Sequence, residues 1–339
     1  MNSKELIRRI IEHDSPPRLG FDFLGNNPTD ILHVPSAVLN RPDGMPVEIW
    51  GRDPALVSRV PGFGGEVKMT AMGNIFGRLT PKTMGECIRG ALQDSWDLLE
   101  YFLFPVINED KDREFEKLQW NRSDKFVITW IPISVWSPLR DTRLCDQALM
   151  DTVAETENVK RFLEKTTDLA VEIIRRAHKN GVNAAMFGED IGTQNDLFYS
   201  PETFRSLFKP FYKKLADELH SRGMKYIVHC CGNIHKVMHD FIDAGVDVFQ
   251  FDQIELIGSK NLADEFANKT AFYCPVDIQK IMATGDEKYI REGAMDMISH
   301  FKKHGGSLIV KDYPSWEDID VLPEWQQWAR DVIIANADL

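Results

Sequence analysis

The chain has 339 residues, of which 43% are hydrophobic and 27% charged, a composition typical of a globular protein with one large domain or two small ones. Its formal net charge of −12, with acidic and basic residues interspersed, argues against a protein that binds nucleic acid through a basic face. No segment approaches the roughly 18 consecutive apolar residues that a membrane-spanning helix needs. We therefore expect neither a nucleic-acid partner nor a membrane partner.

The N-terminal segment 1–19 has no apolar core and no small-residue cleavage site, so it does not resemble a signal peptide. It predicts a short amphipathic helix that ends at Pro16-Pro17. The five cysteines are an odd number and are sparse for a disulfide framework. A cytoplasmic protein with reduced thiols is the expectation.

Short apolar strands alternate with amphipathic helices along most of the chain, which predicts parallel strands joined by helical crossovers. The predicted strands lie within 16–25, 125–133, 182–194, 224–233, 246–253, 270–277 and 307–314. The predicted helices lie within 156–181, 200–223, 234–245, 261–269, 285–304 and 322–337. This pattern is close to that of an α/β protein with a (β/α)₈ TIM barrel.

Seven strands are clear, and we expect the eighth within 30–120, where the periodicity is poor. Segments 46–52 and 73–79 predict an antiparallel hairpin there. We interpret 1–339 as a single TIM-barrel domain in which 26–123 is an elaborated N-terminal excursion between the first two barrel strands. A doubly wound sheet is the alternative, but neither of its usual glycine-rich phosphate loops is present.

Active sites of TIM barrels lie at the C-terminal ends of the strands. In this chain nearly every predicted strand ends in polar residues, which favours an enzyme. The exits supply Asp22, Trp130, Trp136, Glu189, Asp190, Gln194, His229, Cys231, Asn233, Gln250, Asp252, Gln253, Cys274, Asp277, Lys311, Asp312 and Tyr313.

The stretch "KYIVHCCGNIH" (225–235) sets two cysteines beside a histidine. Because side chains alternate along a strand, His229 and Cys231 point to one side and Cys230 to the other. His229 and Cys231 can therefore share a metal ion, and Cys274 leaves a later strand within plausible reach. One imidazole and two thiolates suit tetrahedral zinc with one open position. The competing interpretation is that the cysteines are buried as small hydrophobic residues.

The carboxylates allow several roles. Glu189 and Asp190 can serve as general acids, metal ligands or substrate hydrogen-bonding groups, or they can cap the next loop or pair with an arginine. Asp252 is similar. Aromatic residues near the strand exits either fill the core or form a pocket for an apolar ring.

Three segments together resemble the uroporphyrinogen decarboxylase superfamily: "FGEDIGTQNDLFYSPETFRSLFKPFYKKL", "VHCCGNIHKVMHDFIDAGVDVFQFDQ" and "FYCPVDIQKIMATGDEKYI". The element "VEIWGR" is similar to an acidic-Trp-Gly element of that superfamily, and the resemblance covers most of 125–330. It implies a (β/α)₈ barrel. The decarboxylases carry arginines after the first strand, whereas this chain reads "GFDFLGNNPTD", so porphyrinogen decarboxylation is not expected.

The corrinoid-linked methyltransferases of this superfamily carry His-x-Cys and a distant cysteine as zinc ligands. His229 and Cys231 match the first two, but the final strand "LIVKDYP" lacks the third. The resemblance thus implies metal ligation by His229 and Cys231, with Cys274, Glu189, Asp190 or Asp312 completing the site. Candidate residues for substrate binding or proton transfer are Asp190, Asp252 and Asp312. Candidate residues that contact the substrate are Trp130, Gln194, Phe249 and Tyr313.

The resemblance further implies a Zn²⁺-dependent methyltransferase that is the O-demethylase component of an anaerobic corrinoid system. Zinc would polarise the oxygen of a methoxyaromatic, and the methyl group would pass to cob(I)alamin carried by a separate corrinoid protein. This chain has no Asp-x-His-x-x-Gly motif of its own for binding cobalamin. The alternatives are methyl transfer from a methylcobamide to a thiol, a metal-free decarboxylase or lyase, and a catalytically silent barrel that binds a corrinoid protein.

Overall fold

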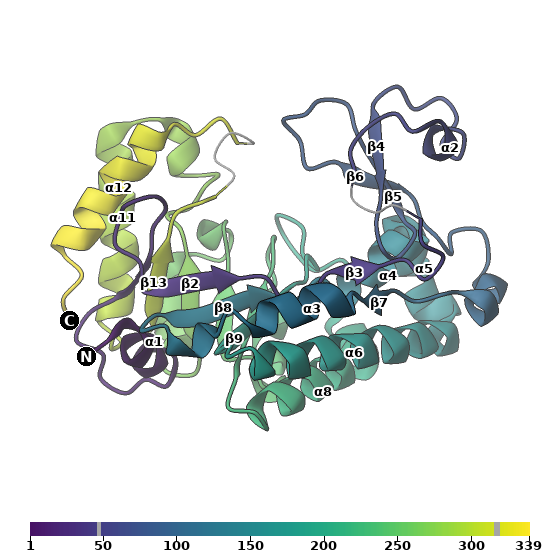
Figure 1. Ribbon diagram of the computed structural model, residues 1–339. Coiled ribbons are helices and arrows are strands. Elements are labelled where there is room, and N and C mark those ends of the chain that lie inside the picture. The colour runs from purple at the N-terminus through teal and green to yellow at the C-terminus, as the bar shows by residue number, and fades with distance from the viewer. Residues whose placement is uncertain (46–48, 315–318) are drawn as a thin grey trace.

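The computed structural model describes residues 1–45, 49–314 and 319–339. Eight strands form one parallel sheet in the order β1-β13-β12-β11-β10-β9-β8-β2, surrounded by helices (Figure 1). The barrel strands are β1 (Gly20–Asp22), β2 (Ile31–Val34), β8 (Phe126–Trp130), β9 (Ala184–Gly188), β10 (Lys225–His229), β11 (Val248–Gln250), β12 (Ala271–Cys274) and β13 (Leu308–Lys311). The predicted TIM-barrel fold is confirmed, and the eighth strand is β2, which lies within the expected range 30–120.

The helices follow the strands as the alternation predicts. After β8 come α4 (Trp136–Arg143), α5 (Cys145–Ala154) and α6 (Thr156–Lys179); after β9, α7 (Pro201–Thr203), the π-helical turn η3 (Phe204–Phe208) and α8 (Lys209–His220). The later crossovers contain η4 (His235–Val237) and α9 (Met238–Ala244), η5 (Ile254–Leu256) and α10 (Ser259–Phe266), η6 (Met282–Thr284) and α11 (Glu287–Lys302), and finally α12 (Pro323–Ala335). Within the described residues, none of the helices combines the length and apolar composition needed to cross a membrane.

The two ends of the sheet, β1 and β2, are joined through Asp30. Its backbone N–H donates to the carbonyl of Phe21 over 2.7 Å, and its carboxylate accepts from the backbone N–H of Phe21 over 2.9 Å. The same buried carboxylate accepts two hydrogen bonds from Arg18 and one from Ser3 of the first helix. Asp30 thus ties the N-terminal helix and both edge strands together.

The predicted excursion, 26–123, includes β2, which is itself a barrel strand. The excursion therefore lies between β2 and β8, the second and third barrel strands along the chain. It contains β3 (Leu39–Asn40), α2 (Pro54–Val57), β4 (Glu66–Met69), β5 (Ile75–Arg78), β6 (Glu86–Arg89), η1 (Trp96–Tyr101), β7 (Val106–Ile107), α3 (Glu109–Glu116) and η2 (Trp120–Arg122). Strands β4, β5 and β6 form an antiparallel sheet that stands to one side of the barrel in Figure 1.

The predicted hairpin between 46–52 and 73–79 is wrong, because the segment 73–79 pairs with other strands. Strand β5 pairs with β4 on one side and with β6 on the other. Of the segment 46–52, residues 46–48 lie outside the described residues, and Gly51 forms an isolated bridge with Val67 of β4. The segment "EVKM" of β4 alternates as a half-buried strand does but over only four residues, and "ECIR" of β6 does not alternate, so the strand signal of both is weak.

Helix α1 (Ser3–Ile11) closes the N-terminal end of the barrel. The side chain of Asn2 caps it by accepting from the backbone N–H of Glu5. Its apolar residues Leu6, Ile7, Ile10 and Ile11 pack in one buried cluster with inward-facing strand residues such as Ile128, Ile227 and Ile309. Gly20 of β1 leaves room for this helix, since a Cβ there would lie 2.7 Å from Cδ1 of Ile7.

Replacing Ile7 by alanine should lower the free energy of unfolding by about 2–5 kcal/mol, because it opens a cavity at a fully buried site. The control is Ile334→Ala on α12, where the side chain is 41% exposed and the expected change is about 0.5 kcal/mol or less. Urea denaturation measures both. Equally small changes in the two variants would show that the packing of α1 against the barrel strands does not stabilise the fold.

Candidate functional site

The inward-facing positions of the barrel strands become polar at the C-terminal rim. Along β10, Ile227 belongs to the inner cluster, whereas Tyr226, Val228 and Cys230 belong to the outer cluster beneath the helices. His229 has the parity of Ile227 and therefore faces inward. The parallel register aligns His229 with Gly188 of β9 and Gln250 of β11, so these strands present their rim residues at one level.

Asp190, His229 and Cys231 form the candidate metal centre. Each offers one ligand atom, and these atoms all lie within 4.8 Å of one another; no other group of three or more potential ligands occurs among the described residues. Nε2 of His229 lies 3.6 Å from Sγ of Cys231 and 3.6 Å from Oδ1 of Asp190. The backbone N–H of Cys231 donates to Oδ1 of Asp190 over 2.8 Å, which fixes the loop after β10 against the loop after β9.

The other ring nitrogen of His229 is held by a chain of polar side chains. Nδ1 of His229 contacts Oε1 of Gln250, and Nε2 of Gln250 donates to Asp252 over 2.8 Å. Lys311 donates to the same carboxylate oxygen over 3.1 Å. Because Oε1 of Gln250 can only accept, Nδ1 of His229 donates to it. This hydrogen bond orients the ring so that Nε2 faces Cys231 and Asp190, in the way that outer contacts orient ligating histidines.

Burial raises the pKa of the Cys231 thiol above its ordinary value, and the neighbouring carboxylates of Asp190 and Asp252 raise it further. A thiolate at this position therefore needs a compensating positive charge nearby. A divalent cation among the three ligand atoms would supply that charge and would stabilise the deprotonated sulfur.

A large cavity opens at the rim beside this group. Its volume is about 840 Å³, and it borders all three candidate ligands together with Trp130, Arg140 and Met84 of the excursion. The ring of Trp130 lies 5.9 Å from the His229 ring, measured between centroids. Gly188 makes space for this indole, because a Cβ on Gly188 would lie 2.7 Å from Cζ2 of Trp130. An apolar ring and polar ligands thus share one cavity, as is typical of a small-molecule site.

Glu189 is placed away from the candidate metal centre. Its buried carboxylate accepts hydrogen bonds from the backbone N–H groups of Val135, over 2.6 Å, and Trp136, over 2.8 Å, at the start of α4. Burial raises the pKa of Glu189 to about 7, and the two backbone donors partly offset this effect. Glu189 follows Ala185 and Phe187 in the outward parity of β9, so it serves as a helix cap in the outer layer.

Three further predicted residues are also not brought to the cavity. Cys274 and Phe249 are fully buried in the outer cluster, because each occupies an outward position of its strand. Gln194 is exposed on the loop after β9 and does not border the cavity. The alternation of side chains separates Cys274 from Cys231, so the geometry leaves Cys274 out of the candidate metal centre.

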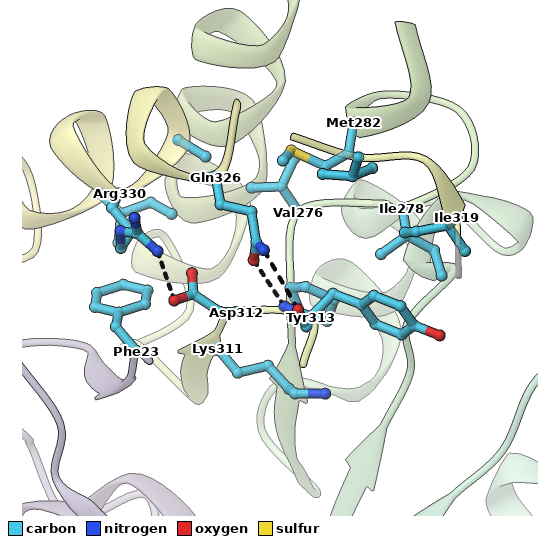
Figure 2. A pocket seen from close by; sticks show the side chains of 14 residues that line it. Phe23, Val276, Ile278, Met282, Lys311, Asp312, Tyr313, Ile319, Gln326 and Arg330 are labelled. Atoms are coloured by element: carbon cyan, nitrogen blue, oxygen red, sulfur yellow. Dashed lines mark hydrogen bonds and ion pairs between the residues drawn. The ribbon is translucent and has the colours of Figure 1, made fainter. Parts of the chain in front are cut away.

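Asp252, Asp312 and Tyr313 all border the cavity. The carboxylate of Asp312 has a structural role, because it accepts two hydrogen bonds from the protein. Figure 2 shows it turned toward Arg330, whose Nη1 donates over 2.6 Å. The backbone N–H of Leu24 donates to it over 2.8 Å. Burial raises the pKa of Asp312, and these two donors partly offset it. The backbone of Tyr313 is held by the side-chain amide of Gln326 (Figure 2).

A second polar cluster borders the same cavity and was missed in part by the sequence analysis. Asp22 of β1 lies 2.7 Å from Nε2 of His33 on β2, and it also accepts a hydrogen bond from the hydroxyl of Tyr273 on β12. Only Asp22 stood among the predicted strand exits. His33 was not predicted as a site residue because β2 was not located in the sequence. Tyr273 was not predicted because the neighbouring residue Cys274 was chosen as the candidate at the end of that strand.

Comparisons with known proteins agree with this architecture. A methylated-thiol–coenzyme M methyltransferase from Methanosarcina mazei is 23% identical over 139 residues, which cover 41% of this chain and only 36% of that protein. A solved structure of a methyltransferase from Methanosarcina mazei superimposes with a TM-score of 0.61 at 11% identity and covers 98% of this chain and 99% of that chain. This structural likeness concerns the fold.

The model of the family described as uroporphyrinogen decarboxylase (URO-D) matches residues 131–311, which is more than half of the chain. The matched range runs from the end of β8 to the end of β13 and includes every residue of the candidate metal centre. The chain therefore belongs to the uroporphyrinogen decarboxylase family.

Proposed function

We propose that the protein is a zinc-dependent methyltransferase that moves a methyl group from a methoxyaromatic to the cob(I)alamin of a separate corrinoid protein. The observation that carries the proposal is the convergence of Asp190, His229 and Cys231 at the mouth of a large cavity. Two similar proteins from Methanosarcina mazei, the methylated-thiol–coenzyme M methyltransferase and the methyltransferase that shares the fold, support this class of reaction.

The three side chains fit a zinc ion by their chemistry. They offer one imidazole nitrogen, one sulfur and one carboxylate oxygen, and zinc sites of the catalytic type use three protein ligands and leave a fourth position open. The hydrogen bond from His229 to Gln250 provides the outer contact that ligating histidines usually make. Bound zinc would act as a Lewis acid on the ether oxygen of the substrate.

The chain's own residues would bind and orient the substrate. Trp130 offers an aromatic face beside His229 for a methoxyaromatic ring. Lys311 and Gln250 donate hydrogen bonds to Asp252 and hold it at the cavity wall, where its carboxylate can accept a hydrogen bond from the substrate. As the methyl group leaves for the corrinoid, the electron pair of the broken C–O bond stays on oxygen, and the phenolate then takes up a proton.

A second candidate function is methyl transfer that involves a thiol. It is favoured by the name of the curated relative, a methylated-thiol–coenzyme M methyltransferase. The donor set argues for the ether instead, because it holds one cysteine and a carboxylate rather than two cysteines. An oxygen-containing site is harder and suits an oxygen ligand better than a thiolate.

The purified protein should contain close to one zinc ion per chain. His229→Ala and Cys231→Ala should each lose most of it, since each removes one of three protein ligands. Cys274→Ala is the matched control and should keep its zinc, because Cys274 lies in the outer layer. Elemental analysis by mass spectrometry provides the measurement. Loss of zinc from the Cys274 variant but not from the Cys231 variant would contradict the proposed ligand set.

Gln250→Leu should weaken zinc binding by about 10- to 100-fold, because it removes the acceptor that orients His229 without removing a ligand. Gln194→Leu is the control, since Gln194 is exposed and outside the cavity. Competition with a chromogenic chelator gives both dissociation constants. The same affinity in wild type and Gln250→Leu would exclude the proposed role of Gln250.

Mixing the protein with 2-methoxyphenol and cob(I)alamin should produce the absorption spectrum of methylcobalamin without any added thiol. Removal of zinc should slow this reaction by about 100-fold or more, because Lewis-acid catalysis contributes several kcal/mol to the transition state. Demethylation of methylcobalamin that occurs only when a thiol is added would favour the second candidate. Full activity of the zinc-free protein would rule out the proposed mechanism.

A further inference from the structure

Asp22, His33 and Tyr273 form a compact cluster that the proposed chemistry does not use. Oδ2 of Asp22 lies 2.7 Å from Nε2 of His33 and accepts from the hydroxyl of Tyr273, while Oδ1 accepts from Thr29 over 3.1 Å. The Asp22 side chain is 12% exposed, whereas that of His33 is 54% exposed and borders the cavity. Side chains from β2, from β12 and from the loop before β2 therefore converge on the carboxylate of Asp22 in β1.

The cluster lies across the barrel from the candidate metal centre. In the strand order, β1 and β2 are the two ends of the sheet, and β10, which carries His229, is four strands away from β1. Both clusters border the same cavity. Lys311 stands between them: its ammonium donates to Asp252 over 3.1 Å and lies 5.6 Å from the centre of the Tyr273 ring. A ligand in the cavity can thus meet one cluster at each end.

The hydrogen bonds to Asp22 leave other polar atoms of this cluster available to a ligand. Hydrogen bonds from His33, Tyr273 and Thr29 hold the pKa of Asp22 below its ordinary value despite its burial, so the carboxylate is ionised. Because an ionised carboxylate only accepts, Nε2 of His33 and the Tyr273 hydroxyl both donate to it. A lone pair of the Tyr273 oxygen then remains as an acceptor, and Nδ1 of His33 is left to hydrogen-bond with a ligand hydroxyl group, which can both donate and accept. Within the described residues, Nδ1 has no hydrogen-bond partner.

We propose that Asp22, His33 and Tyr273 form a second substrate subsite, which accepts a hydrogen bond from a hydroxyl group at the end of the substrate opposite the methyl ether. The inference deepens the proposed function and rests on it, because the metal centre would hold the ether oxygen. An aromatic ring between the two clusters would lie beside Trp130. The subsite selects a neutral hydroxyl over a carboxylate, since the Asp22 carboxylate repels a second negative charge.

The test compares 4-methoxyphenol with 4-methoxytoluene, which has the same shape but a methyl group in place of the hydroxyl. Binding is measured by calorimetry on the zinc-loaded protein without corrinoid, so no methyl transfer takes place. Wild type should bind the phenol about tenfold more tightly, as expected for one net hydrogen bond. His33→Ala and Tyr273→Phe should each remove most of this preference and leave the affinity for 4-methoxytoluene unchanged.

Tyr226→Phe is the matched control, because it removes the hydroxyl of another buried tyrosine whose side chain lies in the outer layer. This variant should keep the tenfold preference. The inference is overturned if wild type binds the two compounds equally or binds neither, or if His33→Ala and Tyr273→Phe both retain the preference. Circular dichroism checks that each variant is folded.

Failure of this inference is distinguishable from failure of the proposed function. If the preference for the phenol depends on His33 but no methylcobalamin forms with either compound, the subsite stands and the methyl-transfer proposal fails. If both compounds are demethylated and His33→Ala changes their kcat/KM values by the same factor, the methyl-transfer proposal stands and the subsite fails.

Discussion

The alternation of side chains along the parallel strands of the barrel determines what this protein can place in its cavity. Each strand sends every second residue inward, and the register between neighbours brings the last inward residues to one level at the rim. On β10 this rule sends His229 inward and Cys230 outward, and Cys231 follows His229 beyond the strand end. Helix α1 fills the opposite end of the barrel and packs on apolar inward residues, whereas the inward residues at the rim are polar.

The same rule explains which site residues could be predicted and which could not. Applied to β10, it separates Cys231 from Cys230 correctly. Applied equally to β9, β11 and β12, it would have sent Glu189, Phe249 and Cys274 outward, where the structure places them. Those three residues were chosen by their chemical type and their nearness to a strand end. Asp190 lies just beyond β9, and only the fold shows that it meets His229 and Cys231.

The order of the strands from β8 to β13 was predictable because a helix follows each of them, and the alternation of strand and helix is a strong signal. The position of β2 was not predictable, because this strand has four residues, is separated from β1 by only eight residues and is followed by an irregular excursion. Missing β2 also concealed His33, and with it the cluster around Asp22. The contacts of Gln250 with His229 and of Asp312 with Arg330 depend on strand register and helix placement, which a single sequence does not reveal.

The two polar clusters border the same cavity, with Lys311 between them and Trp130 along the wall. In the function that we propose, one cluster binds the metal and the other forms hydrogen bonds with the substrate. The proposed function depends most on the identity of the metal ligands. The zinc X-ray absorption spectrum of the purified protein tests it directly. The account predicts one sulfur neighbour at about 2.3 Å and nitrogen or oxygen neighbours at about 2.0–2.2 Å, from Cys231, His229 and Asp190. Two or more sulfur neighbours, or a protein that binds no zinc, would contradict it.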